Sequence, residues 1–264
     1  MIIGTIGLGN MASALLTGFT GSGQVKNTDI IGADASEAMR LKAADRFGIF
    51  VTASNKEAAE KADVLFLCVK PVVMPLVLEE LRDTVTEDTL LVSIAAGKTV
   101  KWIEDFFDHP VKLVRCMPNT PALVQAGMTA VCRNSNVSDE ELNLVMSLLT
   151  GCGLAEVVPE TLMDAVVGVS GSSPAYVFMM IEAIADAGVK GGMQRGQAYR
   201  FAAQAVMGSA KLMLETGLHP GELKDMVCSP AGTTIDAVEV LEENGFRAAL
   251  MKAVDACIEK SKKL

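Results

Sequence analysis

Two glycines near the start of the chain, Gly7 and Gly9, lie where an apolar stretch meets a helix-forming one. Residues 2–6 are rich in β-branched side chains and predict a strand, whereas the residues from Asn10 onward favour a helix. Gly7, Gly9 and Ala12 fit the pattern G-x-G-x-x-A, whose small residues let a tight turn and a helix N-terminus approach a pyrophosphate. The free N–H groups and positive dipole end of that helix favour phosphate. The stretch predicts a dinucleotide-binding turn, although a strand, turn and helix without a ligand would share the pattern.

A carboxylate, Asp34, follows the second predicted strand, which covers residues 29–33. In folds that bind dinucleotides, the residue ending the second strand meets the adenosine ribose, where an acid accepts a hydrogen bond from the 2′-hydroxyl and repels a 2′-phosphate. Aspartate is also a favoured helix N-cap, and a helix is predicted over 37–47. Cofactor binding and helix capping therefore both remain open for Asp34. Because a loop side chain can turn away from a 2′-phosphate at little cost, we expect both NADH and NADPH to be used.

The elements that position these groups alternate between strand and helix. Further strands are predicted over 49–52, 64–69, 90–94, 112–117, 128–133 and 155–158, with helices between them. Capping boxes beginning at Ser54 and Ser138 mark two helix starts. This alternation is typical of the α/β class with a parallel sheet.

Small and polar residues follow five of these strands, at 7–11, 34, 69–71, 95–97 and 117–121. The carboxyl ends of parallel strands share one edge, where open α/β sheets bind ligands. Small residues there let a ring approach the backbone, and Lys70 or Asn119 can supply hydrogen bonds. We expect a ligand at this edge, although turn chemistry explains each segment taken alone.

From Glu160 onward the periodicity is helical, over 161–170, 174–190, 195–216, 220–228 and 233–262. We therefore expect a Rossmann-like parallel-sheet domain over 1–160 and an all-helical domain over 161–264. Two loops of the helical part, 171–174 and 229–234, place hydroxyl groups before a helix. Either would hold a small carboxylate through hydroxyl and backbone N–H groups, and ordinary capping explains the same residues.

The composition limits the class of protein and its partners. The chain has 264 residues, 50% of them hydrophobic, and a formal net charge of -9; its mean hydropathy is +0.34. No apolar run reaches the roughly 18 residues of a membrane span, and the most apolar helix candidate, 176–189, is interrupted by Glu182 and Asp186. The excess apolar surface predicts an oligomer interface. The acidic balance argues against nucleic acid or an anionic membrane as partner.

The N-terminus and the cysteines indicate the compartment. No basic segment precedes the first apolar stretch, so we expect no signal peptide and a cytoplasmic protein. Six cysteines are scattered without a C-x-x-C pair, which favours free thiols over disulfides or a metal site.

Several longer strings share the order and spacing of a known family. They are IGLGNMA at 6–12, VKP at 69–71, SIAAG at 93–97, RCMPNTP at 115–121, GSSPAYVF at 171–178 and HPGELKDMVCSPAGTTIDAVEVLEENGFRAA at 219–249. Over essentially its whole length, the chain resembles the pyrroline-5-carboxylate reductases. The resemblance implies a Rossmann domain followed by a helical dimerisation domain, with further assembly of dimers into a decamer in many members. It also implies reduction of L-1-pyrroline-5-carboxylate to L-proline, the last step of proline biosynthesis, with NADPH or NADH.

The same resemblance implies roles for individual residues. The dinucleotide would contact Ile6, Gly7, Leu8, Gly9, Asn10, Met11, Asn55, Val69, Lys70, Pro71, Ala95, Ala96 and Gly97. The substrate would contact Glu160, Thr233 and Thr234. The interpretation of the two hydroxyl-bearing loops as carboxylate sites adds Ser172, Ser173 and Gly232 to the predicted substrate contacts. Thr234 would be catalytic, by hydrogen-bonding the ring nitrogen or by passing it a proton through water. The chain has Ser173 and Ala231 where the family usually has glycine, and the second difference alters the carboxylate site if Ala231 cannot adopt a glycine's backbone angles.

Reduction of an imine does not require the acid-base residues that this sequence lacks. The chain has no Ser-His-Asp set, and its two histidines, His109 and His219, each precede a proline as loop residues often do. A protonated imine is already electrophilic, so it requires positioning against a nicotinamide more than a strong acid. The nearest alternative, a dehydrogenase of the 3-hydroxyacid or 6-phosphogluconate type, needs a lysine base on the helix after its glycine-rich loop. Here no lysine follows Gly171 until Lys190. A dinucleotide-binding redox sensor is the non-enzymatic alternative.

Overall fold

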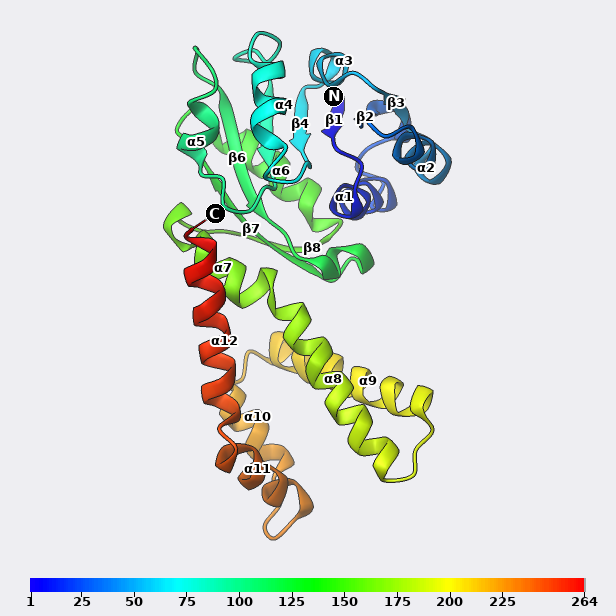
Figure 1. Cartoon of the computed structure of the whole chain (residues 1–264), viewed down its shortest axis with the longest axis vertical. Coiled ribbons are helices and arrows are strands. Elements are labelled where there is room, and N and C mark those ends of the chain that lie inside the picture. Colours follow the sequence, from blue (N-terminus) through cyan, green and yellow to red (C-terminus); the bar gives the residue numbers. More distant parts are fainter. Residues whose placement is uncertain (264) are drawn as a thin grey trace. The chain divides into compact units, whose positions relative to one another are not determined.

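The computed structural model describes residues 1–263 and divides into two compact units (Figure 1). The first comprises Met1–Ser172 together with the C-terminal residues from Cys257, and the second comprises Ser173–Ala256. The sequence places the domain boundary near residue 160. By contacts, the residues from 161 to 172 and the end of the last helix group with the first unit.

The first unit alternates strands and helices along the chain. Its strands are β1 Ile3–Ile6, β2 Ile30–Ala33, β3 Phe50–Thr52, β4 Val64–Leu67, β5 Leu90–Ser93, β6 Lys112–Met117, β7 Gly127–Arg133 and β8 Gly153–Val157. Its α-helices are α1 Asn10–Gly21, α2 Glu37–Phe47, α3 Asn55–Lys61, α4 Met74–Leu81, α5 Val100–Glu104, α6 Asp139–Thr150 and α7 Met163–Val166. Short 3-10 turns lie at η1 Asn27–Asp29, η2 Thr120–Val124 and η3 Glu160–Leu162, and a π-helical segment, η4, covers Val167–Gly171.

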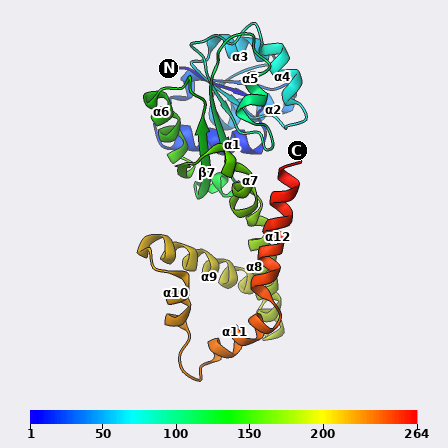
Figure 2. The same ribbon diagram turned by 90° about the vertical axis from the view of Figure 1, so that its left-hand side faces the viewer.

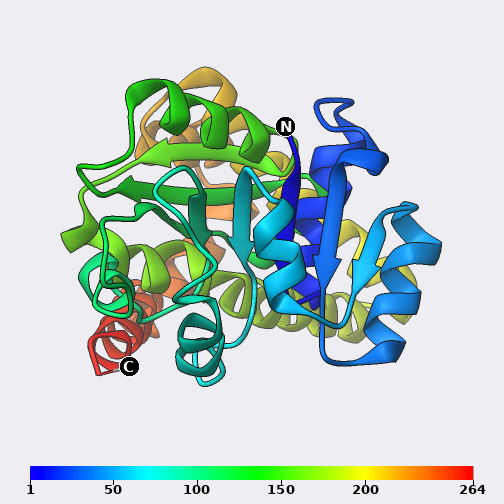
Figure 3. The same ribbon diagram turned by 90° about the horizontal axis from the view of Figure 1, so that it is seen from above.

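The eight strands form one sheet in the order β3-β2-β1-β4-β5-β6-β7-β8, seen from above in Figure 3. All neighbouring pairs are parallel except β6 and β7, which are antiparallel. The expected parallel sheet is therefore correct for the first six strands, and the chain reverses direction once after β6. Residues of α1, α2 and α6 build the core on one face, and residues of α3, α4 and α5 build it on the other.

The helix starts follow their predicted caps with one exception. Ser138 and Glu141 form the complete capping box at α6. At α3, Ser54 accepts a hydrogen bond from the Glu57 backbone N–H, but the Glu57 carboxylate bonds Thr52 and Lys61 instead of returning to the cap. The capping box predicted at Ser54 is therefore only half formed, because other donors compete for Glu57.

The second unit consists of helices (Figure 2). They are α8 Ser173–Lys190, α9 Arg195–Thr216, α10 Pro220–Val227, α11 Thr233–Glu243 and α12 Phe246–Ser261, the last of which re-enters the first unit at Cys257. Their core among the described residues is a small cluster of Ala185, Ala198 and Ala202. Many large apolar side chains are exposed instead, among them Phe178, Met179, Phe201, Leu214, Met226 and Met251.

The chain runs from η3 through α7, η4 and α8 as one helical stretch. This stretch, Glu160–Lys190, has 31 residues and contains an 18-residue window with a mean hydropathy of 1.2, so by length and composition alone it could cross a membrane. Asp164, Glu182 and Asp186 interrupt its apolar residues, so it contains no uninterrupted apolar run of 18 residues. The helix is longer than expected because the π-helical turn joins two predicted helices into one. The helix predicted to begin at Pro174 has no separate start.

Candidate active site

The turn between β1 and α1 has the backbone geometry that its glycines predict. Gly7 has φ +90°, and a Cβ there would lie 2.9 Å from the backbone carbonyl of Cys68. The Gly7 N–H donates to the Ala33 carbonyl at 2.7 Å, which ties the turn to the end of β2. At Gly9 a Cβ would meet no atom within 4 Å, so the space beside this residue is open. Ala12 is fully buried, as the third small position requires.

The N-terminus of α1 is free to bind an anion. Gly9 is its N-cap and supplies no side-chain hydrogen bond, and no acidic side chain lies in the first turn. The N–H groups of this turn therefore keep their hydrogen-bonding capacity, and no acidic residue of the turn itself compensates the positive end of the helix dipole. With open space at Gly9, these features fit a pyrophosphate.

Asp34 is bound to this turn. One oxygen, Oδ2, accepts a hydrogen bond from the Leu8 N–H at 2.8 Å, and Oδ1 accepts one from the Ser36 N–H at 2.8 Å. The N-cap of α2 is Ser36, so Asp34 does not cap that helix. Of the two interpretations open from the sequence, helix capping is wrong, and the carboxylate faces the glycine turn.

The five ligand-edge loops come from five neighbouring strands, because β2, β1, β4, β5 and β6 are consecutive in the sheet. Lys70 is exposed, and its backbone oxygen accepts hydrogen bonds from the Val73 N–H at 2.9 Å and from the Met74 N–H at 3.2 Å. Ala95 is buried, and Gly97 has φ +72°. Asn55 donates through Nδ2 to Glu80 Oε2 at 2.8 Å, so its side chain also holds α3 to α4.

Asn119 is occupied within the first unit. Its Oδ1 accepts a hydrogen bond from the Met128 N–H at 2.9 Å, and its Nδ2 donates to the carbonyl and hydroxyl oxygens of Ser170 at 3.3 and 3.2 Å. The side chain expected to serve a ligand therefore connects the loop after β6 to the π-helical segment.

Glu160 also has protein partners. Its Oε1 accepts hydrogen bonds from Arg115 Nη1 at 2.8 Å and from the Val100 N–H, at the start of α5, at 2.7 Å. The Arg115 side chain is 7% exposed and that of Glu160 is 35% exposed. Both line a cavity of about 300 Å³ together with Gly97, Thr99, Thr161, Asp164, Ser261 and Lys262. Sequence reasoning missed Arg115. The available signal was a charged residue in the otherwise apolar centre of the strand β6.

The two hydroxyl-bearing loops differ in structure. The Ser172 N–H donates to the Val167 carbonyl at 2.8 Å, within a continuous helical path, so residues 171–174 do not form an open helix start. Gly232, by contrast, is a true N-cap for α11 and has no side-chain cap. A Cβ at Gly232 would lie 2.3 Å from Ser229 Oγ, so a side chain there would displace Ser229. Ala231 has φ +55°, so it does adopt the left-handed conformation that a glycine would.

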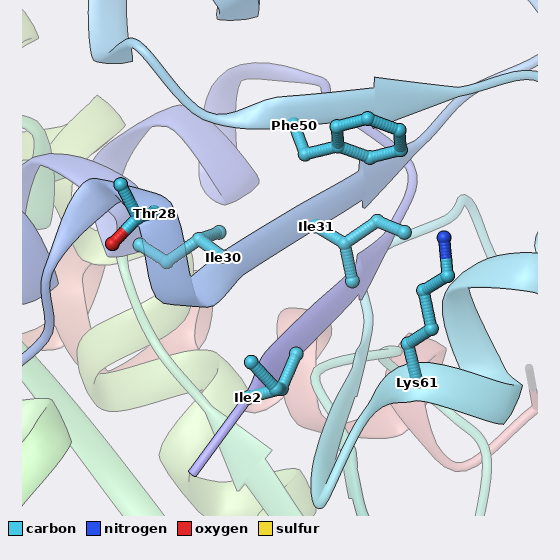
Figure 4. Close-up of a pocket in the computed structure, with 6 residues that line it drawn as sticks. All are labelled: Ile2, Thr28, Ile30, Ile31, Phe50 and Lys61. Carbon is cyan, nitrogen blue, oxygen red and sulfur yellow. The ribbon is translucent and has the colours of Figure 1, made fainter.

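A second cavity, of about 340 Å³, lies away from these residues (Figure 4). It is lined by Ile2, Thr28, Ile30, Ile31, Phe50 and Lys61. Several of these residues begin or precede β1, β2 and β3, so the cavity lies toward the amino ends of the strands. Lys61 Nζ lies 5.0 Å from the centre of the Phe50 ring. None of the residues expected to bind cofactor or substrate lines it.

Comparison with known proteins gives consistent matches along the chain. Residues 160–264 match the family model described as pyrroline-5-carboxylate reductase dimerisation, and residues 2–97 match NADP oxidoreductase coenzyme F420-dependent. The pyrroline-5-carboxylate reductase of Escherichia coli (strain K12) is 55% identical over 99% of this chain and 97% of its own length. A Plasmodium falciparum pyrroline carboxylate reductase structure with NADP bound has a TM-score of 0.90 and 32% identity, over 100% of this chain and 97% of that one. A Coxiella burnetii pyrroline-5-carboxylate reductase structure has a TM-score of 0.92 and 34% identity, over 99% and 97%.

Proposed function

Because the chain belongs to the pyrroline-5-carboxylate reductase family, we propose that its dinucleotide lies along the carboxyl edge of the sheet and its imine at residues 229–234. The chain is an NAD(P)H-dependent oxidoreductase that reduces L-1-pyrroline-5-carboxylate to L-proline, the last step of proline biosynthesis. The placement of the dinucleotide rests on the five loops of neighbouring strands beside the uncapped N-terminus of α1.

The proposed mechanism relies on positioning. NAD(P)H, when bound, supplies a hydride to the imine carbon. The first turn of α1 holds the pyrophosphate, and the loop residues 69–71 and 95–97 border the rest of the dinucleotide. The backbone N–H of Thr233, at the start of α11, would hold the substrate carboxylate beside Gly232, whose own N–H donates to the Ser229 carbonyl at 3.0 Å. The Thr234 hydroxyl accepts or donates a hydrogen bond at the ring nitrogen, and no stronger acid is required because the protonated imine is already electrophilic.

The Thr234 role is tested by Thr234→Ala, with Thr234→Ser as the conservative variant. Losing one hydrogen bond to a charged group corresponds to roughly 1.5–3 kcal/mol, or about one to two decades in kcat/KM for the imine. We expect unchanged dinucleotide affinity, because the hydroxyl is proposed to lie at the substrate, and we expect Thr234→Ser to restore most of the activity. Thr216→Ala, at the end of α9, is a matched control outside the proposed site. An unchanged kcat/KM in Thr234→Ala would remove the residue from the mechanism.

The chain forms an oligomer through its dimerisation domain, and we propose a homodimer that associates further into a decamer. The proposal is supported by the exposed apolar side chains of the second unit, whose own core is small. In this proposal a second copy of the chain, and not lipid, covers the apolar stretch 160–190. The protein would then be cytoplasmic. We expect sedimentation at micromolar concentration to show no folded monomer. Phe201→Glu should weaken assembly, while Leu41→Glu, at an equally exposed site on α2, should not. Sedimentation of the wild-type chain with membranes would contradict this assignment.

A further inference from the structure

Arg40 lies in the first turn of α2, close to the end of β2. Its Nη1 donates to the Asp34 carbonyl at 2.7 Å and to the Ala35 carbonyl at 3.1 Å. The side chain is only half-buried. Two backbone carbonyls therefore hold the guanidinium beside the segment that joins β2 to α2, although Arg40 is six residues beyond Asp34.

The charge of Arg40 is not matched by a neighbouring acid. None of the ion pairs among residues 1–263 includes Arg40, and its two hydrogen-bond acceptors are neutral carbonyls. Both contacts use Nη1, and a guanidinium has five N–H donors in a planar fork that suits phosphate. Arg40 is thus an anchored cation with donors to spare at the end of β2.

Asp34 presents the opposite charge from the same segment. Each of its carboxylate oxygens accepts one backbone N–H, from Leu8 or Ser36, and each can accept another hydrogen bond. Because two N–H groups hold the carboxylate, it does not turn away freely when a ligand arrives. The end of β2 therefore carries a fixed acceptor and a fixed cation together.

We propose that Asp34 and Arg40 divide the recognition of the two cofactors between them. Asp34 accepts hydrogen bonds from the free 2′-hydroxyl of NAD(H), and Arg40 pairs with the 2′-phosphate of NADP(H), offsetting the repulsion from Asp34. The chain therefore binds both dinucleotides, and each residue determines the affinity for one of them. This inference rests on the proposed placement of the dinucleotide at the carboxyl edge.

The test measures dissociation constants for NADH and NADPH by fluorescence titration, without imine. Arg40→Gln should weaken NADPH about tenfold or more, the size of a lost charge-assisted hydrogen bond, and leave NADH within about twofold. Asp34→Ser should weaken NADH about tenfold or more and not weaken NADPH. Arg46→Gln removes the same charge from the same helix, where the guanidinium contacts Thr17 and the Phe47 ring, and should leave both constants unchanged.

The decisive quantity is the ratio of the NADH and NADPH dissociation constants measured on one preparation, because unfolded protein lowers the fluorescence signals of both titrations alike. A crossed result, in which each variant loses one cofactor, supports the division. An unmoved ratio in either variant overturns it while leaving the dinucleotide site intact. If the wild-type chain binds neither dinucleotide, the proposed cofactor site itself is wrong, which is a distinguishable outcome.

Discussion

Glu160 has two competing roles that a single substitution separates. The family resemblance implies a substrate contact, whereas the structure shows its Oε1 bound to Arg115 and to the start of α5. Glu160→Gln keeps the shape of the side chain and removes its charge, leaving a guanidinium that is 7% exposed without its carboxylate. If the ion pair is the main role, the protein loses stability and KM for the imine stays within about twofold.

The expected loss follows from burial. Removing one partner of a fully buried pair costs about 3–5 kcal/mol. Glu160 is 35% exposed, so solvent screens part of its interaction, and we expect about 1.5–3 kcal/mol. At roughly 2–4 °C per kcal/mol for a unit of this size, Tm should fall by about 3–12 °C.

Tm is measured by calorimetry at one fixed protomer concentration, because oligomer stability depends on concentration. Glu215→Gln is the matched control, since its pair with Lys211 is solvent-exposed and should contribute little. Replacing both Arg115 and Glu160 with apolar residues should recover part of the loss, because no charge is then left buried. A Tm within about 1 °C of wild type, together with a KM raised tenfold, would refute the ion-pair reasoning and favour the substrate contact.

Three further outcomes are expected. Burial raises the pKa of Glu141, but hydrogen bonds from a lysine and from the helix cap outweigh it and hold this pKa below its usual 4.5. The ionised carboxylate therefore stabilises the fold above pH 4.5, and this stabilisation is lost as the pH falls through the native pKa. Glu141→Gln should accordingly flatten the decline of Tm in acid. Burial raises the pKa of Cys68 to about 12, and three further cysteines are buried. Thiol labelling of the native protein should therefore modify at most Cys228 and Cys257, and all six thiols should react only after denaturation. Ala231→Gly relieves a left-handed backbone conformation that costs about 1–2 kcal/mol in a residue with a side chain. The greater entropy of glycine in the unfolded chain offsets part of this gain. Tm should therefore rise by about 1–4 °C, and a lower Tm would contradict the claim that Ala231 is strained.

The amino-acid sequence by itself determined the dinucleotide turn and the edge at which ligands gather. The glycine turn was readable from local residue types, because a tight turn between a strand and a helix requires a residue that adopts positive φ, as Gly7 does. The shared edge follows from alternation alone, since parallel strands joined by helices present their carboxyl ends together. The helical second part was likewise readable from its period.

Only the tertiary structure decided what the polar side chains do. Asp34 was equally suited to capping a helix and to facing the glycine turn, and the choice depended on the Leu8 N–H, 26 residues away. Glu160 found Arg115 at a separation of 45 residues, and Asn119 found Ser170 at 51. Local propensity describes a residue's own backbone, whereas a hydrogen-bond partner depends on which distant segments the fold brings together.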